Sequence, residues 1–263
     1  MFRDKITVII QGPLHPNSLV SVRTLAKDFN IIISTWKTNT RDERNLDKLL
    51  ENGDHVTVVS HNIESLEFVN NDANRYYQFY GTYRGLLLVE TEYVIKIRAD
   101  EYYTDLFPFA EAILANPEKL VSNEVFFRNP DSIEAENFLF HPSDHLYGGK
   151  TSLLKKALEH CVEDCKKLTL EDLKTKFENI QNKSYNIVPE QHLFANFIQA
   201  KFVDFKFDKK ISNLNDALKT IQKDNCVIVP SNELGFYCIS YGTNYSFYPN
   251  EEYFSIRKDL KTI

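Results

Sequence analysis

The first hundred residues contain four short apolar runs that predict buried β-strands. The first two runs are rich in β-branched residues and apolar at successive positions, which is typical of a strand covered by helices on both faces. Stretches with helical signals separate the runs, and this alternation predicts an α/β fold with a Rossmann-like, mostly parallel sheet. The predicted strands are Ile6–Ile10, Ile31–Thr35, His55–Ser60 and Tyr93–Arg98, and the predicted helices between them are Leu19–Asp28, Asn45–Asn52 and Asn71–Glu90.

The second half of the chain is less regular and contains no repeat, linker or low-complexity tract. We therefore predict a single domain over residues 1–263 with an irregular C-terminal lobe. The elements predicted in this half are strands at Asn123–Arg128, Phe138–His141 and Cys226–Val229, a loop at Pro142–Gly149, and helices at Thr151–Cys165, Leu170–Ile180 and Pro189–Gln199.

Composition and charge restrict the class of protein. Hydrophobic residues make up 43% of 263 positions, enough for a full core. The net charge of -6 and the scattered basic residues argue against nucleic acid as a partner. The cysteines form no C-x-x-C pair, so a zinc site is disfavoured, and no apolar run approaches the roughly 20 residues that span a bilayer. We expect a cytoplasmic protein with at most a peripheral contact at the inner membrane face.

Polar residues gather where the predicted strands end. In a parallel sheet these ends converge on one edge, where ligands bind. An aromatic ring there can stack on a base, cations can bind phosphate, and carboxylates can hold a divalent metal. This pattern favours a nucleotide diphosphate as the ligand. The residues concerned are Gln11, Gly12 and Pro13 after the first strand, Ser34, Thr35 and Trp36 after the second, and Lys96, Arg98, Asp100 and Glu101 at the end of the fourth.

Several of these segments, taken in order, resemble the WavE family of lipopolysaccharide-synthesis proteins. They are IIQGPL, IIISTW, DANR at residues 72–75, YVIKIRAD and SDHLYGG, with a weaker continuation at Pro189–Gln191. The resemblance implies a glycosyltransferase with the GT-A fold that moves a sugar from a nucleotide-diphosphate donor onto an oligosaccharide or lipid-linked glycan of lipopolysaccharide or capsule. It also implies a nucleotide-sugar-binding half over residues 1–128 and an acceptor-binding half over 129–263.

The resemblance further implies a divalent metal, Mn²⁺ or Mg²⁺, at a D-x-D type site. The matching segment is Arg98-Ala99-Asp100, so Asp100 is the residue carried over as metal ligand. Arg98 replaces the first acid, and an arginine can itself neutralise a diphosphate. The donor-binding residues predicted on this basis and from the strand ends are Gln11, Gly12, Pro13, Thr35, Trp36, Asn74, Arg75, Lys96, Arg98 and Asp100.

Two acids are candidates for the base that takes the proton of the acceptor hydroxyl. Glu190 begins a predicted helix, where the resembled fold places its catalytic acid, and it is the preferred base if the reaction inverts. Asp144, in the Gly-containing segment Ser143–Gly149, is then expected to contact sugar hydroxyls. The remaining predicted acceptor- or sugar-binding residues are His145, Tyr147, Gly148, Gly149 and His192.

Two other functions fit parts of the pattern. A nucleotidyl- or phosphotransferase of surface-glycan synthesis would use the same basic edge, although the sequence lacks the P-loop and the kinase glycine loop. A non-catalytic glycan-binding module would explain the Tyr-rich stretch Tyr237–Tyr248 but has no need for the charged strand end.

Overall fold

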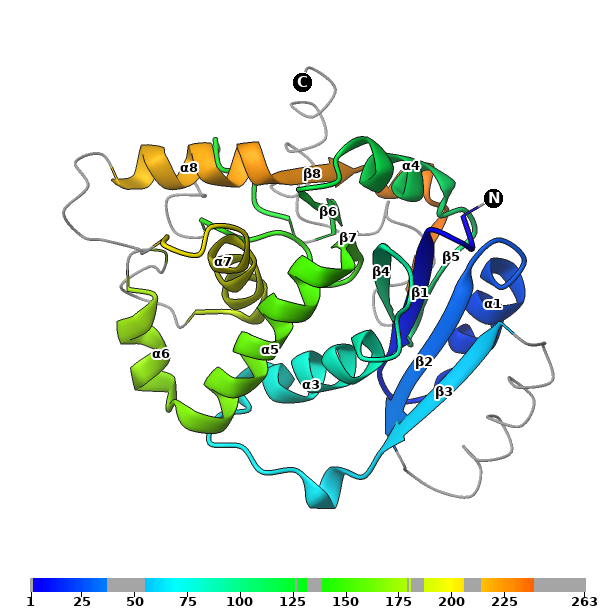
Figure 1. Cartoon of the computed structure of the whole chain (residues 1–263), viewed down its shortest axis with the longest axis horizontal. Helices are drawn as coiled ribbons and strands as arrows, with labels where there is room; N and C mark the ends of the chain where they lie inside the picture. The colour runs from blue at the N-terminus through cyan, green and yellow to red at the C-terminus, as the bar shows by residue number, and fades with distance from the viewer. Residues whose placement is uncertain are drawn as a thin grey trace.

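The computed structural model describes residues 2–36, 55–125, 127–131, 139–178, 180, 187–205 and 214–238. Its centre is a seven-stranded sheet in the order β3-β2-β1-β4-β7-β6-β8 (Figure 1). All neighbouring strands pair in parallel except at β7, which runs antiparallel to β4 and β6. The predicted α/β class with a mostly parallel sheet is confirmed. The strands are β1 (Ile6–Gln11), β2 (Asn30–Trp36), β3 (Val56–His61), β4 (Tyr93–Arg98), β6 (Leu120–Asn123), β7 (Tyr147–Lys150) and β8 (Cys226–Val229), and a separate ribbon pairs β5 (Glu101–Tyr103) with β9 (Phe236–Cys238).

Helices cover both faces of the sheet, because the central strands are apolar on both sides. Ile9 of β1 packs into a core with α3, α5 and α7, which lie side by side in Figure 1. Its neighbours Val8 and Ile10 point to the other face and pack with α1 and α4. The helices are α1 (Pro16–Leu25), α3 (Arg75–Leu86), α4 (Phe107–Ala115), α5 (Thr151–Lys167), α6 (Leu170–Lys176), α7 (Pro189–Lys201) and α8 (Leu214–Asn225).

Two glycines allow α3 to lie directly against β1. A Cβ atom on Gly85 would stand 2.9 Å from Cγ2 of Ile9, and one on Gly81 would stand 3.2 Å from Cγ of Gln11. Glycine lowers helix propensity by roughly 1 kcal/mol relative to alanine, so its repetition four residues apart needs a packing reason. The close approach supplies it, and it brings the start of α3 next to the end of β1.

Several predicted boundaries are wrong. The strand expected at Asn123–Arg128 lies at Leu120–Asn123, because the chain turns at Glu124, whose carbonyl accepts from the Phe127 amide. The described residues of the strand expected at Phe138–His141 form a turn, with Phe140 in the left-handed region at φ 61°. The expected loop at Pro142–Gly149 instead leads into β7.

The remaining differences concern helix boundaries and elements that the sequence did not predict. The long helix expected over Asn71–Glu90 is confined to α3, after a short 3₁₀ turn at Asp72–Asn74, and the helix expected over Leu170–Ile180 ends at Lys176. The elements β5, α4, α8 and β9 were not predicted. The expected helix Asn45–Asn52 and most of the Tyr-rich stretch lie outside the described residues, and the division of one domain at residue 128 stays a prediction. Among the described residues, no helix is both long enough and apolar enough to span a bilayer.

Candidate active site at the carboxyl ends of the central strands

A cavity of about 400 Å³ opens where β1 and β4 end. The chain places β2 on one side of β1 and β4 on the other, so the strand order reverses between β1 and β4. Ligands of open α/β sheets bind beyond the carboxyl ends of the strands at such a reversal. The residues that line the cavity are Gln11, Gly12, Pro13, Leu14, His15, Trp36, Ile63, Asn74, Tyr77, Gln78, Lys96, Arg98, Ala99, Asp100 and Asp144.

Hydrogen bonds between neighbouring segments fix the cavity floor. Gln11 and Arg98 are paired in register, and the Ala99 amide donates to the Gln11 carbonyl at 2.9 Å. The first turn of α1 holds the turn after β4, because Asn17 Nδ2 donates to the Asp100 carbonyl at 2.7 Å and Ser18 Oγ to that of Ala99 at 2.9 Å. The charged end of β4 is therefore anchored by backbone contacts rather than by its own side chains.

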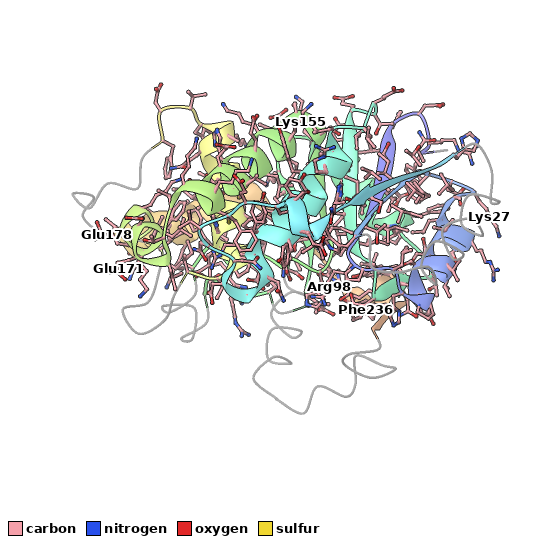
Figure 2. All side chains as sticks on the ribbon, turned by 90° about the horizontal axis from the view of Figure 1, so that it is seen from below. Lys27, Arg98, Lys155, Glu171, Glu178 and Phe236 are labelled. Carbon is pink, nitrogen blue, oxygen red and sulfur yellow. The ribbon has the colours of Figure 1, made fainter. Side chains whose placement is uncertain are left out.

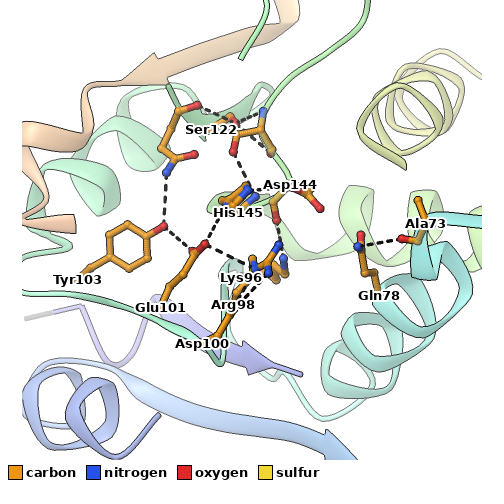
Figure 3. A network of polar contacts seen from close by, with 12 residues as sticks. Ala73, Gln78, Lys96, Arg98, Asp100, Glu101, Tyr103, Ser122, Asp144 and His145 are labelled. Atoms are coloured by element: carbon orange, nitrogen blue, oxygen red, sulfur yellow. Dashed lines mark hydrogen bonds and ion pairs between the residues drawn. The ribbon is translucent and has the colours of Figure 1, made fainter. Parts of the chain in front are cut away.

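Arg98 and Asp100 form a two-pronged ion pair on the cavity wall (Figure 3). Arg98 Nε donates to Oδ1 of Asp100 at 3.0 Å, and Nη2 donates to Oδ2 at 2.8 Å. Burial alone would raise the pKa of Asp100, but the guanidinium beside it lowers that pKa below its usual value. Both side chains are partly exposed, at 27% and 28%, and Arg98 is labelled on the lower side of the molecule in Figure 2.

Lys96 lies two residues before Arg98 and faces the same side of β4. Its side chain is buried, and Nζ donates to the backbone carbonyl of Asp144 and stands 5.2 Å from the centre of the Tyr147 ring. Burial lowers the pKa of Lys96 to about 8, although the nearby Asp144 carboxylate opposes that change. The ammonium is thus poorly solvated and close to a cavity that has room for an anion.

Glu101 points away from the cavity, although it follows Asp100 directly. It is fully buried, accepts from the Tyr103 hydroxyl at 3.1 Å and bonds to Nδ1 of His145 (Figure 3). Burial alone would lower the pKa of His145, but the Glu101 carboxylate raises it above its ordinary value. These two residues form a buried ion pair behind the cavity wall.

The two candidate acids differ in position and protonation. Asp144 lines the cavity with a side chain 13% exposed, and Glu190 is half-buried and is not among the lining residues. Burial alone would raise the pKa of Asp144, but nearby His145 and Lys96 lower it. Burial, reinforced by the Asp144 charge, raises the pKa of Glu190 to about 8. At neutral pH Asp144 is ionised and Glu190 carries a proton.

The residues at this wall do not fit a divalent metal well. Both oxygens of Asp100 accept from Arg98, Glu101 is turned into the interior, and Arg98 stands where a second carboxylate would be needed. Within the described part of the chain, no group of three or more His, Cys, Asp or Glu side chains is arranged to hold a metal ion. Asp100, the residue predicted to bind the metal, therefore already has its charge paired with that of Arg98.

The sequence pattern of one protein family, described as WavE lipopolysaccharide synthesis, matches residues 6–256. The chain belongs to this family. The match spans every strand described above, and the cavity sits on the segments that carried the resemblance, so the family relation and the site concern the same part of the WavE chain. No curated protein sequence matches the chain.

Solved structures that resemble this WavE protein include glycosyltransferases, all at low overall similarity. A mannosyltransferase from Pyrobaculum calidifontis, solved with GDP-Man and Mn²⁺, is 16% identical over 59% of this chain and 47% of its own, with a TM-score of 0.40. TarS of S. aureus is 11% identical over 73% of this chain and 34% of its own, with a TM-score of 0.41. The glycosyltransferase GlyE of Streptococcus pneumoniae is 11% identical over 86% of this chain and 45% of its own, with a TM-score of 0.42. The WavE chain spans less than half the length of each of these proteins.

Most predicted donor-binding residues of the WavE chain lie on the cavity, and two do not. Thr35 is buried and, by strand alternation, faces away from its neighbours Ser34 and Trp36, which pack toward α3. Arg75 is fully buried, where it donates to the Ile187 carbonyl. The expectation that Arg75 contacts the nucleotide finds no support in this geometry. Those that line the cavity are Gln11, Gly12, Pro13, Trp36, Asn74, Lys96, Arg98 and Asp100.

The residues predicted on the acceptor side are less well placed. His192 is buried in α7, with Nε2 at 2.9 Å from Asp164 Oδ2 and Nδ1 at 3.3 Å from Arg75 Nη1. A Cβ on Gly148 would stand 2.6 Å from the Val94 carbonyl oxygen, so this glycine lets β7 pack against β4. Gly149 pairs with Val94 near the start of β4, away from the carboxyl ends of the strands that form the cavity. His145 and Tyr147 are buried behind the wall, and only Asp144 of this set reaches the cavity.

Sequence reasoning missed several lining residues. Tyr77 and Gln78 come from the first turn of α3, and Ile63 comes from the segment after β3. Asn74 at the start of α3 has a left-handed backbone, with φ at 57°, which is uncommon outside glycine and marks a specialised turn. A signal was present in the sequence, because the start of a helix that follows a strand in this fold faces the ligand edge of the sheet.

Proposed function

We propose that the protein is a glycosyltransferase that moves a sugar from a nucleotide-diphosphate donor onto an oligosaccharide or lipid-linked glycan of the bacterial surface. The observation that supports this most is the cavity at the strand reversal, which joins an aromatic side, Trp36 and Tyr77, to a cationic side, Lys96 and Arg98. A nucleoside has an aromatic base and a diphosphate has negative charge, so the two sides match the two ends of one ligand. Membership of a lipopolysaccharide-synthesis family supports the surface glycan as the product.

In this mechanism the cations of β4 meet the charge that develops on the leaving diphosphate. Positive groups that are fixed before the reaction and poorly solvated stabilise such charge far better than solvent does. Lys96 is held by the Asp144 carbonyl, and Arg98 is held by Asp100, so neither has to reorganise at the moment of transfer.

Asp144 is the better general base of the two candidate acids, in place of the preference for Glu190 drawn from sequence. A base must be ionised and must reach the hydroxyl that it deprotonates. Asp144 is on the cavity wall with a lowered pKa, whereas Glu190 has its pKa raised to about 8. The pair resembles other sites in which two carboxyl groups with separated pKa values take different roles.

The acceptor hydroxyl oxygen forms a bond to the anomeric carbon of the donor sugar while the bond from that carbon to the diphosphate oxygen breaks. The electron pair of the broken bond stays with the nucleoside diphosphate, next to Lys96 and Arg98. The hydroxyl proton passes to the Asp144 carboxylate.

A thermal-shift screen with nucleoside diphosphates and nucleotide sugars tests the donor class. A ligand at about 100 times its dissociation constant adds about 2.7 kcal/mol of stability, which is roughly 5–10 °C for a protein of this size. We expect such a shift for one nucleotide family and none for the free sugar. Absence of a shift with every nucleotide would contradict the proposal.

Product analysis separates this function from the two alternatives. A glycosyltransferase releases intact nucleoside diphosphate, a nucleotidyltransferase consumes or releases pyrophosphate, and a glycan-binding module releases neither. With the stabilising nucleotide sugar and a glycan extract as acceptor, we expect nucleoside diphosphate to appear in step with the glycosylated product.

A further inference from the structure

The end of β4 has an arginine where metal-dependent sites of this kind place a carboxylate, and the structure shows what that arginine does. Arg98 binds both oxygens of Asp100, so positions 98 and 100 together carry no net charge. A site with carboxylates at both positions would carry two negative charges and attract a cation. Here the charges at these two positions cancel, so the wall lacks that attraction for a cation.

The guanidinium retains hydrogen-bonding capacity toward the cavity. Its bonds to Asp100 come from Nε and one hydrogen of Nη2, and within the described residues Nη1 donates to no protein group. Arginine binds phosphate through paired N–H groups, so a guanidinium held in place by one carboxylate can present its free edge to a diphosphate. Lys96, two residues earlier on the same side of β4, adds a second positive charge.

Neighbouring carboxylates offer little to a cation at this point. Glu101 accepts from Tyr103, bonds to His145 and places Oε1 3.5 Å from Nε of Arg98. Asp144 lies beside His145, with Oδ1 at 3.8 Å from Nε2. A divalent ion at Asp100 would have to stand beside the Arg98 guanidinium, and like charges at that distance repel.

From this geometry we propose that Arg98 and Lys96 take the place of a divalent metal, so that this protein binds the diphosphate of its donor without a metal ion. Asp100 then positions the Arg98 guanidinium instead of ligating a metal. The inference rests on the proposed function, because it concerns how the same donor is held.

Isothermal titration of UDP and GDP into the full chain, once with EDTA and once with Mn²⁺, tests the proposal. We expect the nucleotide that binds to do so in EDTA, with the same affinity when Mn²⁺ replaces the chelator. Binding that requires Mn²⁺ would overturn the inference and leave the proposed glycosyltransferase intact. Absence of binding in both buffers would overturn the proposed function and the inference together.

Variants make the test independent of buffer effects. Arg98→Ala should weaken nucleoside diphosphate binding in EDTA by at least about tenfold, since hydrogen bonds to charged groups are each worth roughly 1.5–3 kcal/mol. Asp100→Asn removes only the positioning contact and should weaken binding less than Arg98→Ala does. A metal site predicts the reverse order, because it would lose its ligand with Asp100, and that order would overturn the proposal.

Lys155→Ala is the matched charge control, because Lys155 is exposed on α5 and lies across the molecule from Arg98 in Figure 2. It should leave nucleotide affinity unchanged, whereas a loss equal to that of Arg98→Ala would mean that overall charge governs binding and would overturn the proposal. Circular dichroism of each variant checks that the fold is retained. Since Arg98 is partly exposed, its replacement should not unfold the chain.

Discussion

Arg98 and Arg75 are both arginines of motifs that the family resemblance linked to the donor, yet they lie in opposite environments. Arg98 is 27% exposed on the cavity wall and is held by a carboxylate that leaves its outer edge open. Arg75 is 0% exposed, and its guanidinium is bound by other groups of the protein. It contacts the Ile187 carbonyl, His192 Nδ1 and, at 3.7 Å, the Asp72 carboxylate. A motif arginine can therefore serve a ligand or serve the fold, and its burial distinguishes the two cases.

The two regions divide the other candidate residues in the same way. The cavity wall contains Asp144 with Lys96 and Arg98, whereas the buried cluster around Arg75 contains His192 and Asp164, with Asp164 also bound by Lys176. The buried cluster joins α3, α5, α6 and α7, and through the Ile187 carbonyl it fixes the start of α7 where Glu190 lies. Changes in the wall should alter activity with stability retained, and changes in the cluster should do the reverse.

Asp144→Asn should give the largest effect in the cavity wall. Loss of a general base lowers kcat by about 10²- to 10⁴-fold, whereas the amide keeps the shape of the side chain and should leave nucleotide affinity close to that of the wild type. Steady-state kinetics with the stabilising nucleotide sugar measure the loss of activity, and urea unfolding measures whether stability is retained. Unchanged kcat would remove Asp144 from the mechanism.

Arg75→Ala should give the largest effect in the buried cluster. Removal of one partner from a buried charged network costs about 3–5 kcal/mol, because the groups left behind stay desolvated and unpaired. Urea unfolding measures the loss, and Arg84→Ala on the exposed side of α3 is the control, with an expected change within about 0.5 kcal/mol. If the variant keeps its full stability but loses nucleotide binding, Arg75 serves the ligand as Arg98 does and belongs to the donor site.

Gly148→Ala should produce a smaller loss of stability. A Cβ at this position would stand 2.6 Å from the Val94 carbonyl oxygen and 2.7 Å from Cδ1 of Ile113, so β7 must shift away from β4. Overpacking of this kind costs about 1–3 kcal/mol. If the variant instead keeps its unfolding free energy but loses activity, Gly148 belongs with the ligand, as the sequence had suggested.

Some elements of the fold could be predicted from the sequence and others could not. The strands β1 and β2 were predictable because side chains on both of their faces are apolar. The strands β3 and β4 followed from their β-branched residues, and the parallel order placed Gln11, Trp36, Arg98 and Asp100 at one edge. In contrast, β7 contains Gly148 and Gly149, whose role depends on strands packed beside them. The helix α4 has an almost uniformly apolar sequence, FPFAEAILA, which shows no helical stripe.

The candidate site was predictable in its outline and not in its details. Strand ends identify which residues meet at the edge, but one sequence does not reveal whether an arginine is buried, as Arg75 is. Nor does it reveal which of two acids keeps its proton, because that depends on burial and on charges from distant segments. The same limit applies to Arg98 and Asp100, whose mutual ion pair changes the meaning of a segment read as a metal site.

Glu190 lies between the two regions, and its replacement should give the smallest effect, a change in how the free energy of unfolding depends on pH. Burial, with the Asp144 charge, raises its pKa from 4.5 to about 8, so between these values the folded chain holds a proton that the unfolded chain has released. The unfolding free energy that this group contributes is therefore fully present below pH 4.5 and is lost as the pH rises toward about 8. Charges at His145 and Arg75 act on the same group and oppose the shift. In urea unfolding across this pH range, the free energy of unfolding should decline more steeply for the wild type than for Glu190→Gln, in which the amide mimics the protonated acid. The difference between the two proteins removes the contribution of histidines that titrate in the same range. Parallel pH curves for the two proteins would mean that Glu190 is ionised in the fold, and the choice of Asp144 as the base would then lose its strongest contrast.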